Sequence, residues 1–566
     1  MTATAERLTD EVLVPSTSQA TWSFLSELSA APASEPGEHA GSAEETPAER
    51  LVTKYPSSPT AIARLARDQL ERGDIAQAVA TAKQVATTGL YSDESALVVA
   101  LGVLLVAGDV ADATSLLDNW ADALHRIAGA SLPAIATLVA ANLKFRRGEV
   151  EAALEMLKAG EQPIASFAAA RGSVLLSAQR YDAALHELRT AITTGPPTVP
   201  VYTNLGYLMA LRGAMRKAIR ATQVATHLAP GDKIANINLA NFFLVRGDWQ
   251  HANDVLDRLS VLHPRDYQVA ACRAGAYMRA GKLPKALSTL TKALSHDVPP
   301  GPQSVPQSDL RALAEIVRRR LGRIDDQTLR HRLTNLFRAT DPPSPSIALN
   351  LAFMTNDSSQ LPTLRDALRR LEHLTSGETV GVEMQVAILE GRFGDASRLS
   401  RNWLSLQPFN SSAAASLTYL VGMAEGRLAE AARIGESAMH RVPREPILAN
   451  NVAFAKVLLG DIGGATAALI SDVATPFPTA TAALIALAKG DDENSEELYR
   501  RAISLVRDDK AMVTLINTYR AIGRFWFASE PPPTFTNLPP SVTSDARISL
   551  LRYAWDTWIH GRSALG

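Results

Sequence analysis

Few residues in this chain have the types and the spacing that catalytic chemistry requires. The single cysteine, Cys272, excludes an intramolecular disulfide and a cysteine-based zinc site, and the eleven histidines are scattered without metal-ligand spacing. The sequence contains no Gly-x-x-x-x-Gly-Lys-Ser/Thr phosphate loop, no His-Glu-x-x-His pair and no Gly-x-Ser-x-Gly elbow. We therefore expect a protein that is not an enzyme and that uses no cofactor and no metal ion.

The residues best suited to binding are asparagines at repeated positions. Asn204 and Asn238 lie 34 residues apart, each directly before a leucine and a small residue, and Asn451 and Asn350 have a similar local context. Asn241 follows Asn238 by three residues, so a helix places both on one side. A carboxamide both donates and accepts hydrogen bonds, which matches one peptide unit without reading its side chain. The alternative is that these amides hydrogen-bond between adjacent helices of the chain itself.

An internal repeat of 34 residues sets the elements that must position these asparagines. Three kinds of residue recur at this period, namely Gly213, Gly247 and Gly281, then Ala218, Ala252 and Ala286, and finally Pro196, Pro230 and Pro264. Glycine permits a tight turn after a first helix, small residues let two helices approach closely, and proline stops the second helix. Such a hairpin cannot bury its apolar face alone, so it must stack on its neighbours.

With this period and this residue pattern, the chain resembles the tetratricopeptide repeat family. The best copies are residues 199–232, 233–266 and 267–300, and residues 165–198 also fit, although Gln179 stands where the turn glycine is expected. Looser copies precede these, and a second run begins near Gly391.

The resemblance implies an all-α fold, a right-handed α-solenoid (superhelix) of tetratricopeptide helix-turn-helix hairpins. In members of this family, asparagines at the first-helix position of Asn204 and Asn238 line an inner groove and hold an extended peptide by its backbone. The resemblance thus makes Asn204, Asn238, Asn241 and Asn451 the candidate peptide- or partner-binding residues. The lysine clamp of family members that bind a C-terminal carboxylate is not visible, because Lys144 and Lys217 are isolated.

Changes in composition divide the chain into six expected segments. These are a mostly disordered acidic tail (1–58), an N-terminal repeat array (59–300), a loop and basic helical connector (301–345), a C-terminal repeat array (346–528), a proline-rich linker (529–542) and a C-terminal capping helix (543–562). Residues 22–28 of the tail are an apolar island that either packs on the first repeat or docks on another protein. The C-terminal helix likewise either caps the array or binds a partner.

The composition argues against several classes of protein. Lys plus Arg (57) balances Asp plus Glu (58), which does not favour a nucleic-acid binder, and the arginine-rich residues 309–338 are typical of a solvated helix face. No apolar stretch approaches the roughly 20 residues that a bilayer span needs, and no targeting segment is apparent. We expect a cytoplasmic protein, and the abundance of alanine and arginine favours a bacterial one.

Together these features predict a non-catalytic scaffold for protein–protein interactions, whose concave groove binds an extended peptide or a partner protein. The expected partners include no nucleic acid. One alternative is a ligand- or peptide-responsive regulator whose two arrays hinge about residues 300–345. Another is an accessory subunit of an enzyme or of a secretion or assembly machine. The sequence leaves the partner, the pathway and the oligomeric state open.

Overall fold

The computed structural model describes residues 46–71, 74–87, 94–106, 109–128, 134–158, 164–295, 305–372, 374, 376–442, 445–469, 475–531, 533, 535, 538 and 540–559. The apolar island at 22–28 lies outside these residues. In the described ranges all regular elements are helical, apart from one isolated antiparallel bridge between Asp357 and Asp545. None of the described helices combines the length and the apolar character that a membrane crossing requires.

The first half of the chain is a series of helical hairpins. A single helix, α4 (Pro47–Lys54), comes first and lies within the expected acidic tail, where Thr46 and Glu49 form a capping box at its start. The hairpins that follow are α5 (Pro59–Glu71) with α6 (Ile75–Thr87), α7 (Glu94–Val106) with α8 (Val110–Ala128), α9 (Ala134–Arg146) with α10 (Val150–Lys158), α11 (Ile164–Ser177) with α12 (Tyr181–Thr194), α13 (Val199–Leu211) with α14 (Met215–Leu228), α15 (Lys233–Val245) with α16 (Trp249–Leu262), and α17 (Tyr267–Arg279) with α18 (Leu283–Leu294).

The second half continues in the same way and ends in a segment without a hairpin partner. Its hairpins are α19 (Gln307–Arg320) with α20 (Asp326–Ala339), α21 (Pro345–Phe353) with α22 (Leu361–Leu371), α23 (Gly377–Leu389) with α24 (Phe393–Leu406), α25 (Ser411–Met423) with α26 (Leu428–Met439), α27 (Pro446–Leu458) with α28 (Ile462–Ala468), and α29 (Pro476–Ala488) with α30 (Asp492–Ser504). The last elements are α31 (Lys510–Phe527), α32 (Pro540–Thr543), α33 (Ala546–Ala554) and the π-helical turn η2 (Trp555–Ile559), and a 3-10 turn, η1 (Ser358–Gln360), precedes α22.

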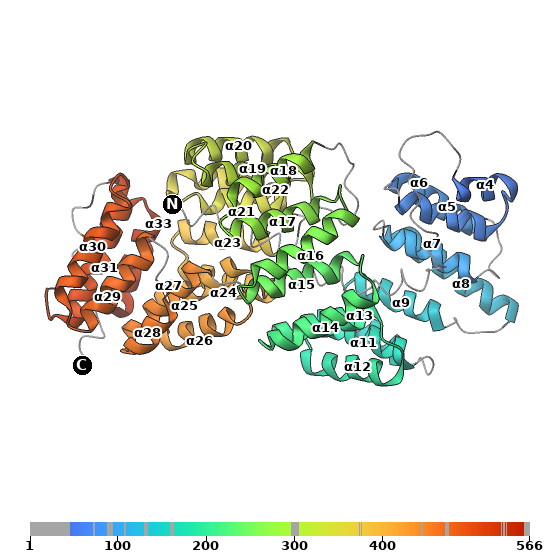
Figure 1. Ribbon diagram of the computed structural model, residues 1–566, viewed down its shortest axis with the longest axis horizontal. Helices are drawn as coiled ribbons and strands as arrows, with labels where there is room; N and C mark the ends of the chain where they lie inside the picture. Colours follow the sequence, from blue (N-terminus) through green and yellow to red (C-terminus); the bar gives the residue numbers. More distant parts are fainter. Residues whose placement is uncertain are drawn as a thin grey trace.

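The hairpins stack one after another, from α4–α9 at the right of Figure 1 to α29–α33 at its left. The first helix of a hairpin contacts its own second helix and the first helix of the next hairpin, as α13 does with α14 and α15. The first helices therefore lie side by side and form one face of the stack, on which the predicted asparagines are placed. The structure thus confirms the predicted all-α solenoid of hairpins.

The stack runs through the expected connector. Helix α18 packs on α19, and α20 packs on α21, so the basic residues between the two arrays form a further hairpin. Its turn residue, Gly322, has a φ of +70°, like the turn glycines of the repeats. Within its run of three arginines, Arg318 pairs with Glu315 and Arg319 pairs with Asp326.

Backbone conformation at the turns follows the predicted register. Gly213, Gly247 and Gly281 have φ values of +72°, +76° and +70°, in the left-handed region that favours glycine. Gln179 adopts the same conformation with a φ of +60°, although it carries a side chain. The turn geometry is therefore kept even where the glycine is replaced.

Small residues allow the two helices of a hairpin to approach closely. Ala218, Ala252 and Ala286 are completely buried at the predicted positions. At Gly206 on α13, an added Cβ would lie 2.1 Å from the Thr222 hydroxyl oxygen and 3.1 Å from the Ala218 carbonyl oxygen of α14. A larger residue at Gly206 would therefore push α13 and α14 apart.

A pair of glycine substitutions tests the turn geometry. We expect Gly247→Ala to lower the free energy of unfolding by about 1–2 kcal/mol, because a Cβ at a φ of +76° strains the backbone although no atom lies near it. The matched Gly394→Ala, at an exposed position of α24 with ordinary φ and equal free space, should instead stabilise by about 0.5–1 kcal/mol. Urea unfolding of both variants measures this difference, and equal effects would show that the turn does not require glycine.

Candidate functional site

Two of the four predicted binding asparagines connect neighbouring first helices. Asn204 on α13 is 2% exposed, and its Nδ2 donates to the Ser173 hydroxyl on α11 at 2.9 Å. Asn451 on α27 donates from Nδ2 to the carbonyl oxygen of Ala415 on α25 at 3.0 Å. These bonds are the intramolecular arrangement that the sequence left open as an alternative to peptide binding.

Asn238 differs, although it occupies the same repeat position on α15. Its side chain is completely buried, and neither Nδ2 nor Oδ1 has a hydrogen-bond partner among the described residues. The two asparagines differ in the residue at the equivalent position of the preceding first helix, 31 positions earlier. This residue is Ser173 for Asn204, which accepts its hydrogen bond, but Tyr207 for Asn238. Asn241, on the same helix, is also buried. The structure therefore groups Asn204, Asn238 and Asn241 on α13 and α15, whereas Asn451 lies in the second array.

The chain itself covers part of the first array beside these asparagines. Phe409, between α24 and α25, packs edge-on against Tyr207 of α13 with ring centroids 5.0 Å apart, and it joins the hydrophobic cluster of the first array. Nearby, the Gln179 Nε2 donates to the carbonyl oxygen of Ser405 at 3.1 Å. A segment that bound along α13 at Tyr207 would have to displace Phe409.

The second array contains a cavity of about 280 Å³ on its first helices. Helices α23, α25, α27 and α29 supply most of its wall, and residues of α31 and α33 close the opposite side. Its polar lining is almost entirely uncharged and includes Gln385, Ser416, Tyr419, Asn450 and Asn451. The predicted residue Asn451 thus lies at a cavity that the sequence did not reveal.

Buried polar atoms without partners surround this cavity. Asn450 is 8% exposed, and its Oδ1 has no hydrogen-bond partner in the part of the chain that the structure describes. The same holds for the hydroxyls of Thr475 and Tyr499. Because Asn451 donates its Nδ2 to Ala415, its Oδ1 faces the Nδ2 of Asn450 at 3.5 Å. The Asn450 amide thus points its Nδ2 toward Asn451, and no described residue donates to its Oδ1.

Burial also sets the protonation of the tyrosines at the cavity. It raises the pKa of Tyr499 well above its usual value near 10, so this hydroxyl stays protonated at neutral pH. The hydroxyls of Tyr419 and Tyr519 lie 3.2 Å apart and share one hydrogen bond, so one of them keeps a proton to donate. The cavity therefore offers neutral donors and acceptors.

Arg547 is the one charged residue of the lining that the structure describes. Its Nε donates to the Asp545 carboxylate at 2.9 Å, its Nη1 lies 2.8 Å from the sulfur of Met512, and Asp509 lies 4.0 Å from its Nη2. Asp545 compensates the charge of the guanidinium, so the described lining presents no unpaired positive charge to a ligand.

The C-terminal segment, residues 540–559, forms one wall of the cavity. The amide of Ala546 donates to the Asn356 carbonyl oxygen at 2.9 Å, and the Trp558 indole donates to the Met423 carbonyl oxygen at 2.9 Å. Of the other large apolar side chains in this segment, Ile548, Leu551, Trp555 and Ile559 are buried, whereas Tyr553 is 39% exposed. The residues expected to cap the array thus contact α23 and α25 as well as α31.

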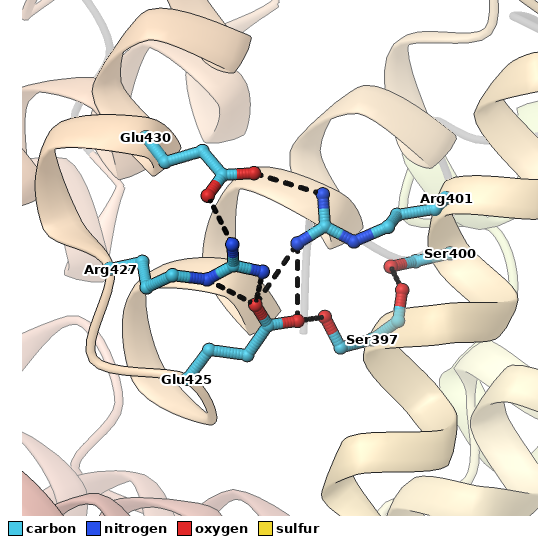
Figure 2. Close-up of polar contacts among 6 residues, drawn as sticks. All are labelled: Ser397, Ser400, Arg401, Glu425, Arg427 and Glu430. Atoms are coloured by element: carbon cyan, nitrogen blue, oxygen red, sulfur yellow. Dashed lines mark hydrogen bonds and ion pairs between the residues drawn. The ribbon is translucent and has the colours of Figure 1, made fainter.

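A balanced ion-pair network holds the turn on which Trp558 rests (Figure 2). Arg401 of α24 contacts Glu425 at 3.0 Å and Glu430 at 3.1 Å, and Arg427 contacts the same two carboxylates. Ser397 donates a hydrogen bond to Glu425. Gly426 lies between these residues, and an added Cβ there would lie 2.9 Å from Trp558. The network is a structural brace, because two arginines compensate two glutamates.

No cluster of three or more His, Cys, Asp or Glu side chains in the described residues could hold a metal ion. Cys272 is completely buried on α17, and burial raises the pKa of its thiol to about 12. The thiol therefore stays protonated at neutral pH, which makes it a poor nucleophile.

Comparisons with known proteins give similarity in structure alone. No protein-family model matches this chain, and no curated protein matches it. Solved structures that resemble it include a tetratricopeptide repeat protein from Parabacteroides merdae (16% identity, TM-score 0.33, 47% of this chain and 98% of that chain). Others are the APC/C hetero-tetramer Cut9-Hcn1 (14% identity, TM-score 0.45, 91% of each chain) and the type IV pilus biogenesis factor PilW (20% identity, TM-score 0.32, 37% of this chain and 94% of that chain).

Two leucine substitutions separate the roles of the equivalent asparagines. We expect Asn238→Leu to raise the free energy of unfolding by about 1–2 kcal/mol, because it replaces a buried amide that has no partner in the described structure with an apolar side chain of similar volume. Asn204→Leu should lower it by about 1 kcal/mol, because the bond to Ser173 is lost. Thermal melts test both, and destabilisation by Asn238→Leu would show that its amide is satisfied in solution.

The brace of Figure 2 predicts a dependence of stability on pH. Partial burial tends to raise the pKa of Glu425, but hydrogen bonds from Ser397 and Arg427 and the charge of Arg401 outweigh it and hold this pKa below its usual value near 4.5. The stabilisation is therefore complete above pH 4.5 and is lost as the pH falls through the lowered pKa. We expect Glu425→Gln to lower the free energy of unfolding by up to about 1 kcal/mol at pH 7. The variant should also lose less stability than the parent chain as the pH falls below 4.5.

The matched control for this measurement is Glu497→Gln, at an exposed position of α30. Denaturant unfolding at pH 7, 5, 4 and 3 compares the two variants with the parent chain. If the free energy of unfolding of Glu425→Gln decreased below pH 4.5 as steeply as that of the parent chain, this carboxylate would not stabilise the turn.

Proposed function

We propose that this chain is a non-catalytic binding protein whose second array holds an extended, uncharged segment of a partner protein on its inner face. The observation that supports this most strongly is the cavity of about 280 Å³, whose described lining combines apolar side chains with the side-chain amides of Gln385, Asn450 and Asn451.

The first helices around the cavity carry amides that suit a peptide backbone. The Gln385 Nε2 on α23 donates to the Thr355 carbonyl oxygen at 3.0 Å, so its Oε1 is still available to accept. Asn450 and Asn451 follow on α27, two hairpins further along. A side-chain amide both donates and accepts, so each of them suits one peptide unit of an extended segment that crosses the face.

The chemistry of the lining selects against charged ligands. Arg547 is already paired with Asp545, and the rest of the described lining is uncharged. A charged side chain brought into this cavity would lose its hydration without gaining a counter-ion. Apolar and uncharged polar side chains lose little hydration free energy on entering the cavity, so we assign a segment of that composition to the site.

The first array supports a second, weaker expectation. Peptide binding by Asn204, Asn238 and Asn241 stays a prediction, and it requires a segment to compete with the contact between Phe409 and Tyr207. The cytoplasmic location expected from the sequence also stays a prediction.

Selection from a random decapeptide library on the full chain tests this function. We expect the enriched peptides to be uncharged and rich in apolar residues. Ser416→Trp, which fills the cavity from a partly exposed position of α25, should weaken their binding by about tenfold or more. The matched Val261→Trp, at a position on α16 that is 77% exposed, should leave binding unchanged.

Three results would contradict the proposal. One is the absence of any enriched peptide, and another is enrichment of charged sequences. The third is equal binding to the Ser416→Trp and Val261→Trp variants, which would place the peptide away from the cavity.

A further inference from the structure

We infer that the contact between the first and the second array is a latch, which holds the chain closed over part of the first array and opens while both arrays stay folded. Its members are Gln179, Tyr181, Tyr207 and Gly213 of the first array and Ser405, Phe409, His440 and Arg441 of the second. The inference concerns the shape of the whole chain and does not depend on the proposed function.

The latch follows the repeat of the chain. The turn at Gln179, between α11 and α12, meets the end of α24, and the turn at Gly213, between α13 and α14, meets the end of α26. The two turns are one repeat apart, and each meets a helix that lies six hairpins later in the chain. The stack thus returns to its own first array, and the two sides lie next to each other in the lower half of Figure 1.

The contact between the two sides is narrow. It is made by turns, a loop and helix ends: the Gln179 Nε2 donates to the Ser405 carbonyl oxygen at 3.1 Å, and a Cβ added to Gly213 would lie 3.5 Å from the Cβ of His440. Among the described residues, none of the helices α11–α14 packs along α24, α25 or α26. Parts of a chain that touch through so small an area move relative to each other, whereas the hairpins of each array share a continuous core.

Gln179 makes its contact at a cost to its own turn. Its φ of +60° lies in the left-handed region, where a side chain strains the backbone, and the turns on either side have Gly148 and Gly213 in this conformation. A glutamine there adds only a side chain, and this side chain reaches Ser405. Backbone strain kept for one contact between distant parts of the chain points to a use for that contact.

Phe409 supplies the apolar contact that favours the closed state. The chain places this residue between α24 and α25, but its ring packs edge-on against Tyr207 of α13 and belongs to the hydrophobic cluster of the first array. Only 7% of the side chain is exposed. Opening the latch would bring both rings into contact with water, so the closed state depends on this aromatic pair.

Arg441 opposes closure. This residue follows α26 and is partly buried beside Tyr181 of α12, and burial lowers the pKa of its guanidinium. Its Nε donates to the Ser437 carbonyl oxygen at 3.3 Å, and no carboxylate of the described residues pairs with it. A cation that leaves water without a counter-ion costs free energy, and opening returns it to water. The closed state is therefore a balance of few contacts, and the loss of one of them shifts it.

Distances measured by pulsed electron paramagnetic resonance test the latch in the full chain. Nitroxide labels on His186→Cys of α12 and Arg433→Cys of α26, both exposed positions, lie on opposite sides of the contact. Cys272 is completely buried, so it takes up no label. We expect one narrow distance distribution in the otherwise unchanged chain. In Gln179→Gly/Phe409→Ala, most molecules should show longer and more broadly distributed distances.

Gln179→Gly separates the latch from the turn. It exchanges one hydrogen bond for a relaxed backbone, so the melting temperature should stay close to that of the parent chain. In the Phe409→Ala background, where we expect both forms to be populated, it should raise the ratio of open to closed molecules about two- to tenfold, the range that one net hydrogen bond supports. The control Leu505→Ala removes an apolar side chain that is 43% exposed at the end of α30, and it should leave the distances unchanged.

Three results would overturn the latch. One is the parent distance distribution in Gln179→Gly/Phe409→Ala, which would mean that other contacts hold the two sides together. Another is a broad distribution in the parent chain that neither substitution changes. The third is the loss of cooperative melting in Phe409→Ala, which would make Phe409 a part of the core that the first array needs in order to fold.

Discussion

The close approach of two helices within each hairpin is the contact on which the rest of this structure depends. It requires small residues where the helices meet, as at Gly206 and Ala252, and a backbone that turns through a positive φ between them. Because each hairpin is thin, its first helix can lie directly beside the first helix of the next hairpin. This arrangement gathers side chains from successive repeats on one face, and it is the reason that Gln385, Tyr419 and Asn450 border one cavity.

Local parts of this arrangement follow from the sequence. The turn glycines, the buried alanines and the helices between them repeat every 34 residues, and each depends on neighbours within one or two repeats. The hairpin of α19 and α20 was expected only as a helical connector, because Gly322 falls outside the 34-residue register. Asn451 was found from its repeat position, but Asn450, its neighbour, has no equivalent in the better copies and gave no signal.

Contacts between distant parts of the chain could not be predicted in this way. The packing of Phe409 on Tyr207 depends on how far the superhelix rotates over several repeats, and a single sequence does not specify that sum of small rotations. The position of the C-terminal segment has the same origin. Large apolar residues recur in this segment, among them Ile548, Leu551 and Trp555, and they favour burial. They do not specify that Ala546 contacts Asn356 or that Trp558 contacts Met423. These long-range contacts shape the candidate site, because Phe409 covers part of the first array and the C-terminal segment helps to enclose the cavity.

The central claim is that partner binding takes place on the inner face of the second array. Hydrogen–deuterium exchange of the full chain, with and without a peptide selected on it, tests this claim most directly. The account predicts slower exchange in α23, α25, α27 and α29 and in residues 540–559, with α13 and α15 unchanged. Protection confined to α13 and α15, around Asn204 and Asn238, would contradict it and would place the binding face on the first array.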